Sequence, residues 1–280
     1  CSDGPFIGLK SYPRGATTNS DSGVTDVSTL YTRGATQYEA IRAVHASGKV
    51  VHPHSELNSK VNGDELDPYD KERYFFAEIM PRLLDAHDGK FSCEHLTSEE
   101  GANFMLEHGK PGRLGCSITP HHLLYDRRDM FRGGLRPHLF CLPVIKRFKH
   151  QMELWALATS SASFVYAGTD SAPHDLRKKE SECCSGGVFS AHAAVEFYAE
   201  AFGRMNALND DGKQFEKFMS LNGPAFYGLK RPADKRVALV REPWTLGDVI
   251  RYSDDPSDVI RPLGYEDNPK VRQPLQWKAL

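Results

Sequence analysis

The sequence lacks the features that would point to a membrane protein, a nucleic-acid-binding protein or a disulfide-rich protein. No apolar run reaches the roughly 20 residues of a membrane-spanning helix. A net charge of -2 leaves no basic excess for nucleic acid or an anionic membrane surface. The six cysteines form no CxxC pair, so we expect free thiols rather than a zinc finger. No expected strand is followed by a glycine-rich phosphate loop, which disfavours an open nucleotide-binding sheet.

What the sequence does have is the composition of an ordinary globular protein. Its 280 residues are 40% hydrophobic and 26% charged, which is enough to bury a large core. The opening residues Cys1 to Pro5 have no basic start and no long apolar stretch, unlike a signal peptide. Together with the expected free thiols, this predicts a cytoplasmic protein.

Short apolar runs alternate with helical stretches along most of the chain. We expect strands at 6–9, 49–51, 90–93, 114–118 and 163–167, and helices at 36–46, 69–86, 97–109, 144–159, 189–205 and 212–220. Alternating strands and helices predict an α/β fold with a parallel sheet, either open and doubly wound or a TIM-like (β/α)8 barrel. The pattern ends near residue 222. We therefore expect one barrel domain over 1–230 and a tail over 231–280 that wraps the barrel, with a short strand at 237–240.

Four polar residues stand at or just after the expected strand ends: Lys10, His54, His95 and Asp170. In a barrel they would meet at the carboxyl-terminal rim, where active sites form. Two histidines and an aspartate are suitable zinc ligands. A lysine amine that has taken up CO2 becomes a carbamate, which can bridge two metal ions. Taken singly, each residue also has an ordinary interpretation, as a solvated lysine, a hydrogen-bonded core histidine or a capping aspartate.

Nine segments in chain order carry a resemblance to a known family. They are Lys10-Ser11-Tyr12-Pro13, Ala16–Ser20, His54-Ser55-Glu56, Glu94-His95-Leu96-Thr97, Ile118–Leu123, Arg136–Leu139, Gly168–His174, Lys179-Glu180-Ser181 and Leu221–Leu229. Together they resemble the dihydroorotases of the short bacterial and fungal type, within the amidohydrolase superfamily. The resemblance runs from about residue 6 to residue 230.

The resemblance implies a (β/α)8 barrel with two zinc ions at its rim. Lys10 would be the carboxylated lysine that bridges them, and His54 and His95 would bind the more exposed zinc. Asp170 would bind the other zinc and act as general base and acid. The implied reaction is the reversible, zinc-dependent closure of N-carbamoyl-L-aspartate to L-dihydroorotate in pyrimidine synthesis, carried out by a homodimer.

The resemblance also implies a set of substrate contacts. His174 would pair with the substrate carboxylate, and His54 would also lie against the substrate. Leu139 and Gly186 would contribute backbone groups. Thr17 and Thr18 would lie on a mobile loop that closes over the ligand.

One departure from the family pattern bears on the fold. The family's first strand carries a His-x-His pair followed by an arginine, and its second supplies an asparagine; none of these is found here. His52-Pro53-His54 has the spacing, but we interpret His52 as a non-ligand. We therefore expect strands four to eight only, and the other histidines, including His121 and His122, to be surface or structural.

Three alternatives stay open. Another metal hydrolase of the same superfamily, such as a hydantoinase, which acts on a cyclic amide, or a lactonase, would share the four rim residues. A catalytically silent fragment would fit the absent strands. An unrelated open-sheet binding protein is the third.

Overall fold

A parallel five-stranded sheet forms the centre of the molecule. The computed structural model describes residues 6–60, 63–209, 211–231, 234–247, 249–264 and 274–280. The strands are β1 (Gly8–Ser11), β2 (Val50–Pro53), β3 (Lys90–Cys93), β4 (Leu114–Ile118) and β5 (Val165–Ala167), and they pair in chain order. All four pairings are parallel. The α/β class is confirmed, and the order is that of an arc of a (β/α) barrel.

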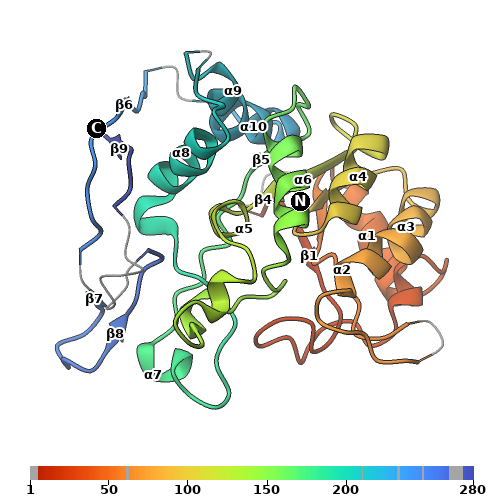
Figure 1. Ribbon diagram of the computed structural model, residues 1–280. Helices are drawn as coiled ribbons and strands as arrows, with labels where there is room; N and C mark the ends of the chain where they lie inside the picture. The colour runs from red at the N-terminus through yellow and green to blue at the C-terminus, as the bar shows by residue number, and fades with distance from the viewer. Residues whose placement is uncertain (1–5, 61–62, 210, 232–233, 248, 265–273) are drawn as a thin grey trace.

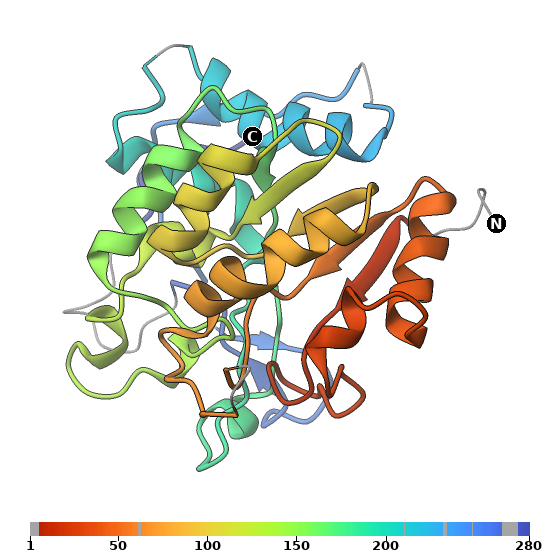
Figure 2. The same ribbon diagram turned by 90° about the vertical axis from the view of Figure 1, so that its right-hand side faces the viewer.

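Helices alternate with these strands and cover one face of the sheet. They are α1 (Thr36–Ala46), α2 (Lys71–Tyr74), α3 (Met80–Ala86), α4 (Glu99–His108), α5 (Pro120–Leu124), α6 (Phe148–Ala158), α7 (Leu176–Lys179), α8 (Ala194–Arg204), α9 (Lys213–Glu216) and α10 (Asn222–Tyr227). Figure 2 shows α3, α4 and α6 side by side across the outer face of the sheet. A π-helical turn at Phe75–Ile79 joins α2 to α3, so that the helix expected at 69–86 is continuous but not uniform.

The buried faces of the helices follow the apolar spacing in one case and depart from it in another. Phe75, Ile79 and Leu83 are buried, as their spacing predicts. Helical spacing in the helix expected at 144–159 also predicts one buried stripe of Ile145, Phe148, Met152 and Trp155, and of these only Ile145, which precedes α6, is buried. Phe148 and Met152 of that stripe are 40% and 49% exposed, and the buried face of α6 consists of Gln151, Leu154, Leu157 and Ala158. Helical spacing alone is compatible with burial of either face of α6. The face that contains Leu154 and Leu157 is buried because α6 packs against α4 and β5.

Thr97 and Glu100 have the spacing of a capping box, which predicts that Thr97 caps the helix expected at 97–109, but the start of α4 differs. The N-cap is Ser98, whose hydroxyl accepts a hydrogen bond from the amide of Gly101. The Thr97 amide and hydroxyl instead donate to the fully buried carboxylate of Glu72, on α2. The long-range contact between Thr97 and Glu72 therefore takes the place of the local capping box between Thr97 and Glu100.

The carboxyl ends of the strands lie at one end of the sheet. Lys10 pairs with His52 across β1 and β2, and Cys93 pairs with Cys116 across β3 and β4. The loops that follow β1 and β2 and the segment with α7 that follows β5 all extend toward the bottom of Figure 1. Side chains at the ends of different strands are thereby brought to a common rim.

The segment after residue 230 forms two small antiparallel pairs. One joins β6 (Leu239–Val240) to β9 (Lys278–Ala279), and the other joins β7 (Ile250–Arg251) to β8 (Val259–Ile260). Leu263 donates its amide to the carbonyl of Phe189. The strand expected at 237–240 is thus shorter than predicted.

Two further properties concern the described residues as a whole. Their five cysteines are all free thiols, as expected, and Cys1 lies outside the described residues. None of the helices found in them combines the length and the apolar character that crossing a membrane requires.

Candidate active site

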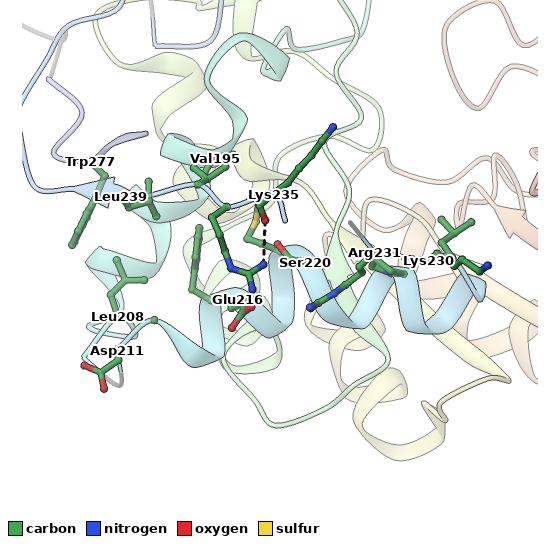
Figure 3. A pocket seen from close by; sticks show the side chains of 17 residues that line it. Val195, Leu208, Asp211, Glu216, Ser220, Lys230, Arg231, Lys235, Leu239 and Trp277 are labelled. Carbon is green, nitrogen blue, oxygen red and sulfur yellow. Dashed lines mark hydrogen bonds between the residues drawn. The ribbon is translucent and has the colours of Figure 1, made fainter. Parts of the chain in front are cut away.

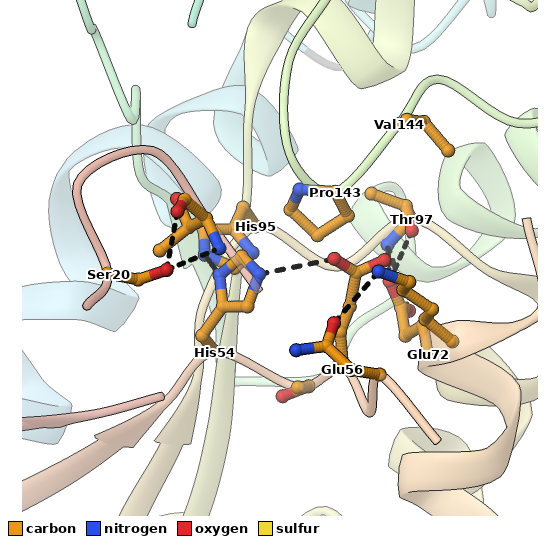
Figure 4. Close-up of polar contacts among 12 residues, drawn as sticks. Ser20, His54, Glu56, Glu72, His95, Thr97, Pro143 and Val144 are labelled. Carbon is orange, nitrogen blue, oxygen red and sulfur yellow. Dashed lines mark hydrogen bonds and ion pairs between the residues drawn. The ribbon is translucent and has the colours of Figure 1, made fainter. Parts of the chain in front are cut away.

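Three of the four predicted rim residues are in direct contact. The Nδ1 atom of His54 lies 3.0 Å from Nε2 of His95, and Nζ of Lys10 lies 3.4 Å from the same Nε2. Figure 4 shows the two imidazole rings turned toward each other. His54 and His95 follow β2 and β3, and Lys10 lies near the end of β1, so side chains from three neighbouring strands bring three nitrogen atoms close together.

Asp170, the fourth predicted residue, follows β5, near enough to Lys10 and His54 for their charges to act on its carboxyl, although the residue as a whole is exposed. Burial raises its pKa, and the charge of Lys10 opposes that rise only in part. His54 and Glu94 also act on this carboxyl through their charges. Both Asp170 (φ 42°) and His95 (φ 45°) have left-handed backbone conformations, which are uncommon outside glycine and often occur at functional sites.

A buried carboxylate orients His54. Oε2 of Glu56 lies 3.2 Å from Nε2 of His54, and both side chains are 1% exposed. Lys146 Nζ lies 3.7 Å from the other oxygen of Glu56. Because Nε2 faces this carboxylate, Nδ1 is the nitrogen that His54 presents to His95.

The structure adds two polar residues that the sequence analysis did not assign to the site. Glu94 pairs with Lys10 Nζ, and its second oxygen lies 3.1 Å from Nδ1 of His52. Burial would raise the pKa of Glu94, but the contacts with His52 and Lys10 outweigh it and lower the pKa. His52 also stacks on Tyr227, with ring centroids 5.6 Å apart. The position of Glu94 directly after a strand was the available signal.

The predicted substrate residues Thr18, His174 and Gly186 form a second group. The Gly186 carbonyl accepts a hydrogen bond from the Thr18 hydroxyl at 3.0 Å and lies 3.0 Å from Nε2 of His174. Thr17, next in the chain to Thr18, exchanges hydrogen bonds with Ser20 through its backbone. The β1 loop and the β5 loop therefore touch each other at Gly186.

Leu139 does not reach this group. It is 3% exposed, and its amide donates to the Arg136 carbonyl at 3.1 Å. Leu142 is the leucine beside Gly186, because a Cβ atom on Gly186 would lie 3.2 Å from Leu142 Cγ. The geometry thus places Leu142, three positions after Leu139, against Gly186, and the substrate contact expected of Leu139 stays a prediction. The repeated leucines of this segment left the sequence assignment ambiguous.

Lys179 fixes the backbone on both sides of Gly186. Its Nζ donates to the carbonyls of Phe140, Ser185 and Gly187 at 2.8–2.9 Å, and the residue is 2% exposed. An ammonium group has three donors, and here all three are satisfied. Burial lowers the pKa of Lys179.

A pocket of about 850 Å³ lies elsewhere in the molecule. It is bordered by α8, by α9 with the turns after it, and by the tail, as Val195, Glu216, Leu239 and Trp277 show in Figure 3. The residues that line it include neither the rim group nor the Gly186 group. The candidate active site is therefore the rim, where the predicted polar residues meet, and not this pocket.

Comparisons with known proteins agree with the fold. No family model matches the chain. A dihydroorotase of Shewanella amazonensis is 43% identical over 242 residues, which are 86% of this chain and 66% of the relative. A dihydroorotase of Pseudomonas aeruginosa is 41% identical over 272 residues, 97% of this chain and 70% of the relative.

Among solved structures, the dihydroorotase of Saccharomyces cerevisiae, crystallised with 5-fluoroorotic acid, superposes with a TM-score of 0.81 at 27% identity. The superposition covers 98% of this chain and 73% of that one. The parallel sheet, its helical cover and the rim of polar strand-end residues thus define an α/β barrel of the amidohydrolase class. Within that class, the chain belongs to the dihydroorotase family. It spans about 66% of the length of the first curated relatives.

Proposed function

We propose that the protein is a metal-dependent dihydroorotase that interconverts N-carbamoyl-L-aspartate and L-dihydroorotate in pyrimidine synthesis. The observation that carries the proposal is the meeting of Lys10, His54 and His95 within 3.4 Å, with Asp170 facing them. The curated relatives named above carry this name at 41–43% identity. That similarity favours a dihydroorotase over a hydantoinase or a lactonase.

The donor set suits a pair of zinc ions. Burial holds the pKa of His95 well below its ordinary value, so its imidazole is neutral and has a lone pair to offer. Nδ1 of His54 faces the same space while Glu56 occupies the other ring nitrogen. Lys10 would join as a carbamate, since its ammonium form has donors only. When bound, the metals supply polarisation of the amide carbonyl and activation of water.

Asp170 is the proposed proton carrier. Burial raises the pKa of its carboxyl, which makes the protonated form easier to reach than for an ordinary aspartate. In ring opening it would take the proton of the attacking water and give it to the ring nitrogen that leaves. In ring closure the same transfers would run in reverse. Its place at the end of β5 faces the Lys10 and His54 side chains from across the rim.

The Gly186 group is the proposed contact surface for the substrate. His174 would pair with the carboxylate, and the backbone at Gly186 would meet the ring, with Leu142 beside it. Thr17 and Thr18 would close over the ligand from the β1 loop. Fixing the substrate against the rim in this way contributes to catalysis by removing rotational freedom before the reaction.

The experiment that tests the function compares ligand binding and turnover in one protein. Zinc-loaded protein is titrated with dihydroorotate and assayed for its hydrolysis, with hydantoin and a lactone as competing substrates. We expect selective turnover of dihydroorotate, and weaker dihydroorotate binding in His174→Ala. Preference for hydantoin or the lactone would contradict the assignment, as would unchanged affinity in His174→Ala. Binding without turnover would favour the catalytically silent alternative.

The remaining expectations rest on the family. We propose a homodimer in the cytoplasm and a two-part chain, with the barrel over 1–230 and a wrapping tail over 231–280. The contacts of the tail with α8 and Phe189 support the wrapping arrangement.

A further inference from the structure

A second cluster of metal-binding side chains is buried beside α5, and the proposed reaction does not use it. It consists of His121, His122 and Cys141, whose ligand atoms all lie within 4.8 Å of one another. The three side chains are between 1% and 3% exposed. The two histidines belong to α5, and the cysteine lies on the segment that leads from Leu139 to Leu142.

The spacing of these atoms is that of a metal coordination sphere. Cys141 Sγ lies 3.7 Å from His122 Nε2, and the Pro143 carbonyl oxygen lies 3.2 Å from the sulfur and 3.1 Å from that nitrogen. In a tetrahedral zinc site with bonds of about 2.0 to 2.3 Å, neighbouring ligand atoms are roughly 3.3–3.8 Å apart. Small movements would therefore place sulfur, nitrogen and oxygen around one cation.

His121 supplies an independent sign that a ligand belongs here. Both of its ring nitrogens are buried and have no hydrogen-bond partner, although buried polar atoms are nearly always paired. Its ring packs against that of His122, with centroids 4.5 Å apart. Burial lowers its pKa well below the ordinary value, so the ring is neutral and can bind a cation. A metal ion would give one of these two nitrogens a partner.

The surroundings of His122 fit the role of a ligand. Its Nδ1 lies 2.7 Å from the hydroxyl oxygen of Thr119, which can accept a proton from that nitrogen. Ligand histidines commonly donate their second ring N–H to an oxygen in this manner. In the absence of a metal ion, Nε2 of His122 can donate to the Pro143 carbonyl, 3.1 Å away. Metal binding would place the proton on Nδ1, and the lone pair of Nε2 would then face the cation.

We propose that His121, His122, Cys141 and the Pro143 carbonyl form a buried site for a thiophilic divalent cation such as Zn²⁺, separate from the rim. Binding forms a metal–sulfur bond and releases the thiol proton of Cys141 to solvent. The bound cation would tie α5 to the segment that carries Leu142, next to Gly186. The proposal does not depend on the function assigned above.

The test uses Co²⁺, because a cobalt–thiolate bond absorbs in the near ultraviolet and the proposed rim ligands include no cysteine. The protein is expressed in cobalt-containing medium with Cys1, Cys183 and Cys184 replaced by serine. These changes remove the thiol of the first residue and the two thiols that are not buried. We expect a thiolate band that persists in Asp170→Asn and disappears in Cys141→Ser. Cys116→Ser is the matched control, because Cys116 is also buried and outside the cluster.

A second variant and a second measurement cover the case in which Cys141→Ser does not fold. His121→Gln retains the cysteine and should weaken cobalt binding on the order of tenfold or more. Metal analysis of zinc-grown protein should show about one equivalent fewer in the cysteine or histidine variant than in Cys116→Ser. A folded parent without the band overturns the proposal, as does a band or a zinc content that the Cys141 and His121 variants leave unchanged.

Discussion

The Nδ1 atom of His54 lies 3.0 Å from Nε2 of His95, although the two residues are 41 positions apart in the chain. Two imidazole nitrogens at this distance can share one proton or bind a metal ion between them. Burial lowers the pKa of His95 and so disfavours an additional proton on the pair. A neutral pair accounts for this distance with one shared N–H, and the proposed metal ion would take the place of that proton. The predictions below follow from the proposed site.

Replacing Asp170 with asparagine should abolish most of the turnover. Asparagine tolerates the left-handed backbone at this position, so the loss would report on the proton transfer and not on strain. We expect the rate to fall by about 10²- to 10⁴-fold. Steady-state assays of Asp170→Asn against the exposed-residue variant Asp254→Asn measure it. Equal rates in the two variants would remove Asp170 from the mechanism.

Replacing Glu56 with glutamine should weaken metal binding at the rim without unfolding the protein. Glutamine has nearly the same size but no charge to hold the Nε2 proton of His54. Loss of such a partner typically costs 10- to 100-fold in metal affinity. Competition of zinc with a chromophoric chelator measures the change, with the exposed Glu65→Gln as control. Unaltered zinc affinity in Glu56→Gln would show that the carboxylate does not orient His54.

Replacing Lys179 with methionine should destabilise the fold and loosen the Gly186 group together. The change leaves three backbone carbonyls without their donor, that of Gly187 buried and those of Phe140 and Ser185 partly buried. We expect a loss of about 2 kcal/mol in the free energy of unfolding. Urea denaturation measures it, and Lys178→Met, at the exposed neighbouring position, should behave like the parent. A Lys179→Met protein as stable as Lys178→Met would refute the bracing role.

Acid should destabilise the fold in part through His192. Burial lowers the pKa of this residue to about 4, from an ordinary value of 6.5. Between pH 6.5 and 4 the unfolded chain binds a proton that the folded chain does not, so this contribution to stability falls as the pH falls. Above pH 6.5 both states are neutral and the contribution is constant.

The His192→Gln variant isolates that effect. Its free energy of unfolding, measured by urea denaturation, should decline less than that of the parent between pH 7 and pH 4.5. The difference should be at most roughly 1.4 kcal/mol per pH unit. The midpoints at pH 7 provide the reference for each protein. Parallel declines in the two proteins would assign the acid sensitivity to other groups.

Much of the sheet could be predicted because its signals are local. The strand at Leu114–Ile118 and the helix at Thr36–Ala46 occur at the predicted bounds, since each is an apolar or periodic run between breaking residues. Long-range contacts decided what the sequence could not. Thr97 bonds to Glu72 instead of capping α4, and no local pattern specifies that partner.

The residues of the candidate site likewise include some that the sequence could predict and some that it could not. Lys10, His54 and His95 could be predicted, because strand ends of a parallel sheet share one rim. Glu94 and His52 were missed as a pair, because their contact depends on the register of β1, β2 and β3. His121 and His122, expected to be surface or structural, are buried, and their proximity to Cys141 arises from the fold of the loop after α5.

Anomalous diffraction at the zinc edge, on crystals grown with zinc, tests the central claim most directly. The account predicts a peak between Nδ1 of His54 and Nε2 of His95, at about 2.0–2.1 Å from each nitrogen. Lys10 and Asp170 should border the same density. Zinc density elsewhere with none at this point, or a rim in which these side chains point apart, would contradict it.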